Sequence, residues 1–105
     1  MSRTTTPEPA SLSAQFQALA NQWKAETALL SSTSALVAHP AYQAIIGLGP
    51  RVIPLLLREL EEEPVHWFEA LKAITGEDPV PPEHWGRIPA MAADWLAWGR
   101  SRGLI

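Results

Sequence analysis

The sequence contains no cysteine, which excludes disulfide bonds, thiolate metal sites and cysteine nucleophiles. It also lacks an uninterrupted apolar run of the roughly 20 residues that a transmembrane helix needs. Residues 1–10 are rich in Thr and Pro and have no apolar core of the kind found in a secretory signal. We therefore expect a cytoplasmic protein with no membrane partner.

Basic residues are few and scattered. Eight Lys and Arg face eleven Asp and Glu, for a net charge of −3. They do not form the basic stripe with which proteins neutralise nucleic-acid phosphates, so a nucleic-acid partner is disfavoured. The one dense charge run, residues 59–63, is most simply a solvated acidic corner. The alternative is a docking patch for a basic partner, formed by Glu61 and Glu62.

Length and composition favour one globular unit. The chain has 105 residues, of which 47% are apolar and 18% charged, as expected for a single soluble core. Residues 1–10 carry no periodic apolar pattern and are predicted to be a disordered tail. Residues 11–105 are predicted to form a single helical domain.

The spacing of apolar residues and the positions of proline and glycine predict about five helices. The first runs from Ser11 to about Leu30, because apolar residues recur there at intervals of three, four and seven. The serines and threonine at 31–34 favour a helix end or a turn. The other four helices begin at prolines 40, 50, 64 and 89, and glycines 47, 49, 76, 99 and 103 lie at or near their ends. No window alternates as a strand does, so the predicted fold is all-α.

Residues 77–87, the Pro-rich segment, interrupt this pattern with three prolines and a glycine. Such a composition is incompatible with a regular helix or a central strand. We predict an extended surface loop that folds against the last helix.

The stretch from Gly49 to Gly76 resembles a HEAT-type helical repeat. Its first helix begins with Val-Ile-Pro-Leu-Leu at 52–56, and its second ends with Ala-Leu-x-x-Ile-Thr-Gly at 70–76. The resemblance implies a helical hairpin at the centre of the fold and protein binding through helix faces. The wider pattern of Trp-x-x-Glu at 23–26, His-Pro-Ala-Tyr-Gln at 39–43, Trp-Phe-x-Ala-Leu at 67–71 and Trp-Leu-x-Trp-Gly at 95–99 is similar to a family of small, uncharacterised bacterial helical proteins.

Three histidines, His39, His66 and His84, are the candidates for acid–base chemistry or metal ligation near neutral pH. Their spacing fits no metal signature, so a metal site would need three distant segments to converge. His39 is better explained as a cap of the helix that begins at Pro40. We predict no cofactor and no metal ion.

The five tryptophans are the most informative feature of the composition. Trp23, Trp67 and Trp95 lie in apolar stripes and are predicted to fill the core. Trp85 and Trp98 have two interpretations: they are exposed anchors for a partner, or they pack the Pro-rich segment over the last helix.

No catalytic arrangement emerges from these residues, so we predict a non-enzymatic protein-interaction module, such as an adaptor or a small antitoxin-like partner. It would bind a protein through helix-face aromatics, and a homodimer is an alternative to a different partner. The expected contact residues are Trp85, Trp98, His84, Glu61 and Glu62. The competing hypothesis is a small metal-binding protein or enzyme that uses His39, His66, His84 and nearby carboxylates.

Overall fold

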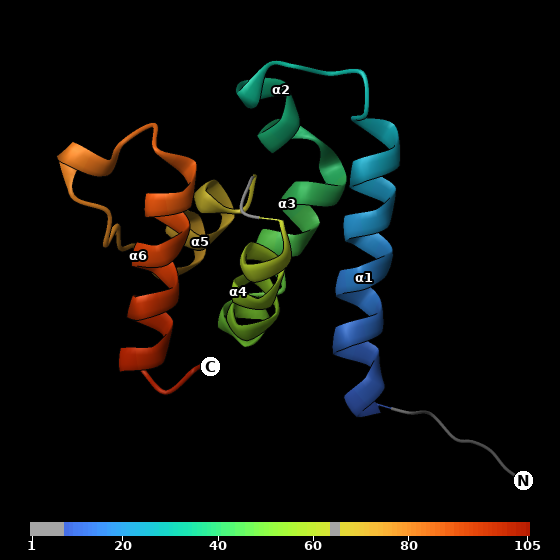
Figure 1. Ribbon diagram of the computed structural model, residues 1–105. Helices are drawn as coiled ribbons and strands as arrows, with labels where there is room; N and C mark the ends of the chain where they lie inside the picture. The colour runs from blue at the N-terminus through green and yellow to red at the C-terminus, as the bar shows by residue number, and fades with distance from the viewer. Residues whose placement is uncertain (1–7, 64–65) are drawn as a thin grey trace, which may run out of the picture. The chain divides into compact units, whose positions relative to one another are not determined.

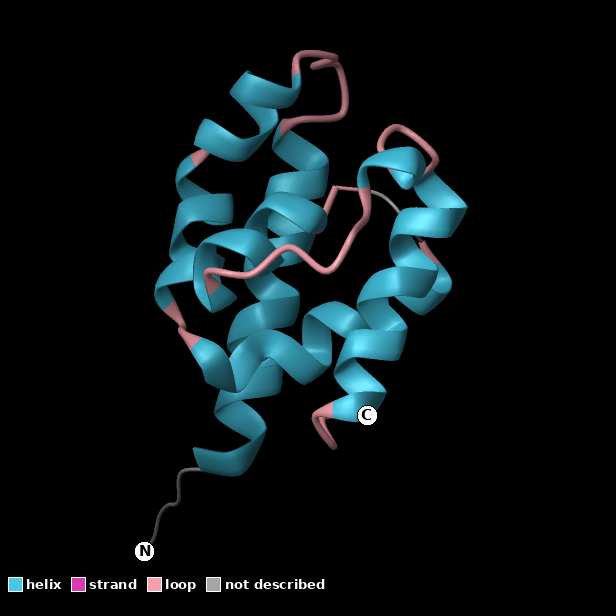
Figure 2. Cartoon of the chain, turned by 90° about the vertical axis from the view of Figure 1, so that its left-hand side faces the viewer, coloured by secondary structure: helices cyan, strands magenta, loops and turns pink. Residues whose placement is uncertain are grey.

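The chain is all-α in the computed structural model, which describes residues 8–63 and 66–105 (Figure 1). Figure 2 shows helices and loops and no strand over these residues. The predicted fold class is thereby confirmed, with six α-helices in the described ranges instead of about five. The chain forms two compact units, Met1–Ile45 and Ile46–Ile105. One domain over residues 11–105 stays a prediction.

The first unit contains α1 (Glu8–Glu26), α2 (Thr33–Ala38) and most of α3 (Pro40–Gly47). Trp23 is its central side chain. The indole N–H donates to the carbonyl of Leu36 at 2.8 Å, and the ring lies 5.3 Å from that of Tyr42. The other buried apolar side chains of this unit are Phe16, Ala20, Ala41 and Ile45.

The boundaries of α1 differ from the prediction at both ends. The helix begins at Glu8, so residues 8–10 of the predicted tail are helical, while residues 1–7 lie outside the described residues. It ends at Glu26 and not at Leu30. The hydroxyl of Thr27 donates to the carbonyl of Trp23, and a turn follows in which the backbone N–H of Leu30 bonds to Thr27. Leu30 is consequently exposed.

Helix α2 is the α-helix that the sequence did not predict. Ser32 adopts an extended backbone conformation, and its hydroxyl accepts a hydrogen bond from the backbone N–H of Ala35. This is an N-cap, which satisfies one of the donors left open at a helix start. The serine-rich run therefore contains the start of a helix as well as a turn.

The second unit contains α4 (Ile53–Glu62), α5 (Phe68–Thr75) and α6 (Ile88–Ser101), with short 3₁₀ helices η1 (Pro50–Val52) and η2 (Pro82–His84). Helices α4 and α6 pack closely at Gly99. A Cβ added there would lie 2.5 Å from Leu57 Cδ1. Gly99 is thus a packing residue inside α6, and the positive φ of Gly103 follows the helix end.

Two helices of this unit start later than predicted. Pro50 opens η1, so α4 begins at Ile53 and places Pro54 in its first turn, as expected. Helix α5 begins at Phe68 and not at Pro64, which lies outside the described residues. His66 has a φ of 70°. Because this left-handed conformation cannot continue a right-handed helix, α5 starts only after it.

Two predicted glycine stops differ in conformation. Gly76 caps α5 in the left-handed conformation, with φ 71° and ψ 11°, as predicted. Gly49 also has a positive φ, 80°, but its ψ of −166° is extended and not left-handed helical. The reason is Pro50, since a residue before proline is driven out of helical ψ by the proline ring.

Candidate functional site

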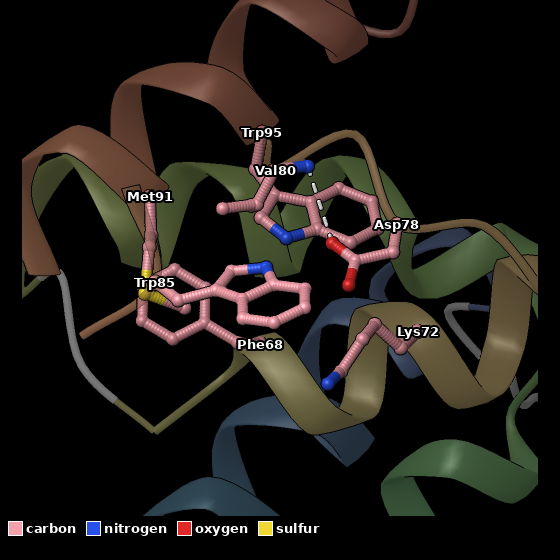
Figure 3. Close-up of a pocket in the computed structure, with 7 residues that line it drawn as sticks. All are labelled: Phe68, Lys72, Asp78, Val80, Trp85, Met91 and Trp95. Carbon is pink, nitrogen blue, oxygen red and sulfur yellow. Dashed lines mark hydrogen bonds between the residues drawn. The ribbon is translucent and has the colours of Figure 1, made fainter. Parts of the chain in front are cut away.

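An open pocket lies in the second unit and is walled mainly by aromatic and apolar side chains. Its volume is about 220 Å³. Figure 3 shows that its walls come from three elements: Phe68 and Lys72 from α5, Asp78, Val80 and Trp85 from the Pro-rich segment, and Met91 and Trp95 from α6. We call these seven residues the Trp85 pocket.

Trp85 lies on an exposed wall of this pocket. The residue is 63% exposed, and Asp78 on the same segment is exposed as well, whereas Phe68 and Trp95 on the other walls are buried. The residue follows η2, where its backbone N–H bonds to the carbonyl of Pro82. In the described part of the chain its indole N–H has no hydrogen-bond partner. Trp85 is thus an exposed tryptophan beside a hollow, which is one of the two interpretations offered by the sequence.

Trp98 follows the other interpretation. It is half-buried and contacts Trp95 edge to face, with ring centroids 5.3 Å apart. Its indole N–H donates to Glu77 Oε1 at 3.2 Å, and Arg102 bonds to the same oxygen at 2.7 Å. Trp98 therefore fastens the beginning of the Pro-rich segment to the end of α6.

His84 fastens the same segment at η2. Its Nδ1 lies 2.7 Å from Asp94 Oδ2 on α6, and both side chains are partly buried. Because a carboxylate accepts, Nδ1 carries the proton of this bond. With anchors at Glu77 and His84, the Pro-rich segment is folded against the last helix, as the sequence predicted.

Asp78 and Lys72 supply the charges of the Trp85 pocket, and both were missing from the residues predicted to bind a partner. Asp78 Oδ1 accepts a hydrogen bond from the backbone N–H of Val80 at 3.1 Å, which forms a local turn. Val80, at the end of this turn, is buried. Lys72 forms an ion pair with Glu69 at 3.1 Å on α5. The isolated valine among prolines was the sequence signal that this segment contributes to a core.

The predicted acidic contact residues do not line the pocket. Glu61 lies near Arg100 at 3.9 Å, and Glu62 is exposed at the last residue of α4. Both carboxylates remain partly or fully open to solvent, as in the simpler interpretation of the acidic run. Their part in binding stays a prediction.

The three histidines occupy different local settings. His39 Nδ1 accepts from the backbone N–H of Ala41 at 3.0 Å, which confirms the predicted cap, and its Nε2 donates to Glu26 at 2.8 Å. His84 pairs with Asp94, and His66 precedes α5 with a positive φ. Over the described ranges, no three His, Asp or Glu side chains are grouped so that they could hold a metal ion.

Comparison of the chain with protein-family models, curated proteins and solved structures gave no match. Within residues 8–63 and 66–105, no single helix is both long and apolar enough to cross a membrane. Helix α3 and residues 50–62 are long and apolar enough only when taken together, and the chain is bent between them. Functional inference therefore depends on the geometry of the Trp85 pocket.

Proposed function

We propose that this chain is a non-enzymatic protein-interaction module that binds a segment of another protein at the Trp85 pocket. The observation that carries the proposal is the 63% exposure of Trp85 beside a hollow floored by buried rings. Tryptophan is enriched among the residues that dominate binding energy, particularly where it adjoins a pocket. Exposing so large an apolar ring is unfavourable in the free protein and is relieved when a partner covers it.

The size of the hollow favours a side chain over a cofactor. Its volume of about 220 Å³ is below the roughly 300–1,000 Å³ of pockets that enclose small molecules. One or two side chains from a partner suit such a space. The rest of the contact would spread over the surface around Trp85.

The anchoring of the Pro-rich segment supports recognition by a preformed surface. Glu77 and His84 hold the segment to α6 on both sides of Asp78, Val80 and Pro81. A partner would then lose less binding energy to ordering this segment. His84 Nε2 makes no hydrogen bond within the described residues, which leaves a polar group for a partner next to Trp85.

The class of protein that we propose is an adaptor, or a small antitoxin-like partner of another protein, acting in the bacterial cytoplasm. We also propose that α4 and α5 form a hairpin of the HEAT type. A second copy of the chain is the alternative occupant of the pocket.

Site-specific crosslinking tests the proposal. A photoreactive phenylalanine analogue is placed at position 85, and, as the control, at Ala97, an exposed residue of α6 that does not line the pocket. After illumination in the native cells, position 85 is expected to yield a discrete crosslinked protein that position 97 does not. With that protein purified, Trp85→Ala is expected to weaken binding about thirtyfold, the effect of a 2 kcal/mol hot spot.

Equal or absent crosslinking from the two positions would refute the proposal. Crosslinking between two copies of this chain would assign the pocket to a homodimer, which sedimentation of the uncrosslinked protein would show independently.

A further inference from the structure

The end of α6 shows how this chain holds a guanidinium group. Arg102 Cζ lies 5.0 Å from the centre of the Trp98 ring, and its Nη2 lies 2.7 Å from Glu77 Oε1. The arginine thus combines a tryptophan face with a carboxylate. Cations are attracted to the negative face of an indole ring, and arginine does this more often than lysine.

The Trp85 pocket repeats two of these three components. Trp85 supplies an exposed indole ring, and Asp78, on the same wall segment, supplies a carboxylate (Figure 3). The component that is missing is the cation. Asp78 has a single hydrogen bond, to the N–H of Val80, and forms no ion pair within the described part of the chain. Its second oxygen remains available.

Lys72 is the one cation in the pocket wall, and its charge is already balanced. The ammonium group lies 3.1 Å from Glu69 Oε2. In the Pro-rich segment Glu77 is likewise paired, with Arg102, so that Asp78 and Glu83 remain beside a single Lys or Arg, Arg87. The charge around Trp85 is therefore complementary to a basic group and unfavourable for an acidic one.

From this pairing we infer that the side chain which the partner inserts beside Trp85 is basic, an arginine or a lysine, held between the Trp85 ring and the Asp78 carboxylate. The inference rests on the proposed function, because it names the chemistry of the partner at the same pocket. The aliphatic stem of such a residue would lie against Phe68 and Met91, since long basic side chains bury their stems and keep the charged head polar.

A pair of peptides that differ only in charge tests the inference. One carries a central arginine between glycines, and the other carries citrulline, a neutral isostere of arginine. Binding is followed by the NMR shift of the Trp85 indole N–H, which is assigned from its loss in Trp85→Leu. The arginine peptide is expected to bind about tenfold more tightly than the citrulline peptide, with the difference reduced by added salt.

Two variants locate the charge. Asp78→Asn keeps an oxygen for the Val80 N–H and removes the charge, so it is expected to abolish most of the preference for arginine. Glu83→Gln is the matched control, because it removes the same charge from an exposed position on the Pro-rich segment outside the pocket wall. It is expected to leave the preference within about twofold. Circular dichroism confirms that both variants are folded.

Equal binding of the two peptides, no shift with either peptide, or equal effects of the Asp78 and Glu83 variants would overturn the inference. Choline is a further probe, and if it binds while the arginine peptide does not, the site takes a free organic cation and the inference is again wrong. None of these results removes a crosslinked partner at position 85, so the proposed function is judged separately.

Discussion

Two connecting segments expose large apolar side chains, and they differ in what surrounds those side chains. Residues 27–32, between α1 and α2, expose Leu29 at 99% and Leu30 at 45%. The Pro-rich segment exposes Trp85 at 63%, beside the pocket. Each segment has a histidine–carboxylate pair nearby, His39 with Glu26 in the first unit and His84 with Asp94 in the second.

The two histidine–carboxylate pairs have different structural roles. The His39 pair joins the residue just before α3 to the last residue of α1, so it brackets residues 27–32 without including any of them. The His84 pair fastens the connecting segment itself, one residue before Trp85, and Glu77 adds a second anchor. Leu29 and Leu30 therefore lie at the tip of a turn, whereas Trp85 forms part of the wall of the Trp85 pocket. Exposure of an apolar side chain indicates a site only when neighbouring contacts make it part of a concave surface.

The largest effect is expected where α6, the support of the Pro-rich segment, packs on α4. Gly99→Ala should lower the free energy of unfolding by about 2–3 kcal/mol, because its Cβ would overlap the fully buried Leu57. The matched control is Gly47→Ala at the end of α3, where an added Cβ meets nothing within 4 Å. That change should raise stability by up to about 1 kcal/mol. Urea unfolding measures both, and equal stability of the two variants would contradict the prediction.

A smaller effect is expected from removing a tryptophan indole N–H group, that of Trp23 in the first unit or that of Trp98 in the second. Trp23→Phe should lower the free energy of unfolding by about 1–2 kcal/mol, because a buried indole is replaced by a smaller ring and the Leu36 carbonyl keeps only the longer hydrogen bond from the His39 N–H, at 3.4 Å. Trp98→Phe should cost at most about 1 kcal/mol, because its acceptor, Glu77, is exposed and can be hydrated instead. Hydrogen exchange should then show faster opening of the Pro-rich segment in the Trp98 variant. The opposite order of stabilities would show that the burial argument fails here.

The smallest effect is expected at the exposed leucines. The double change Leu29→Ser and Leu30→Ser should alter the free energy of unfolding by no more than about 0.5 kcal/mol, because neither side chain is buried. It should also leave binding at the Trp85 pocket unchanged. Thermal unfolding and the arginine-peptide titration check the two statements, and weakened peptide binding would mean that residues 27–32 belong to the site.

Much of the fold followed from local signals. Pro40 does begin a helix, Gly76 does end one, and Trp23, Trp67 and Trp95, which were predicted to fill the core, are buried. The errors arose where the conformation or hydrogen bonds of a single residue outweigh the pattern. The Thr27 turn ends α1 before Leu30, the Ser32 cap starts an additional helix, and the backbone of His66 delays α5.

The candidate site was predicted only in part. Trp85 stood out because it lies in a loop between a proline pair and Gly86 and belongs to no helical stripe. Asp78, Lys72 and Phe68 did not, because their roles depend on which segments meet in space. Trp98 and Trp85 also looked equivalent in the sequence, although one is half-buried against Trp95 and the other is exposed.

The sequence by itself determined the all-α class, the positions of several helix boundaries and the irregular course of the Pro-rich segment, because apolar periodicity, proline and glycine act over a few residues. Only the tertiary structure decided which residues fasten this segment to α6 and that Trp85 faces a pocket with an available carboxylate. Those features depend on contacts such as Glu77 with Arg102 and His84 with Asp94, across 25 and 10 residues of chain. No local pattern specifies such contacts, because helix packing brings the groups together.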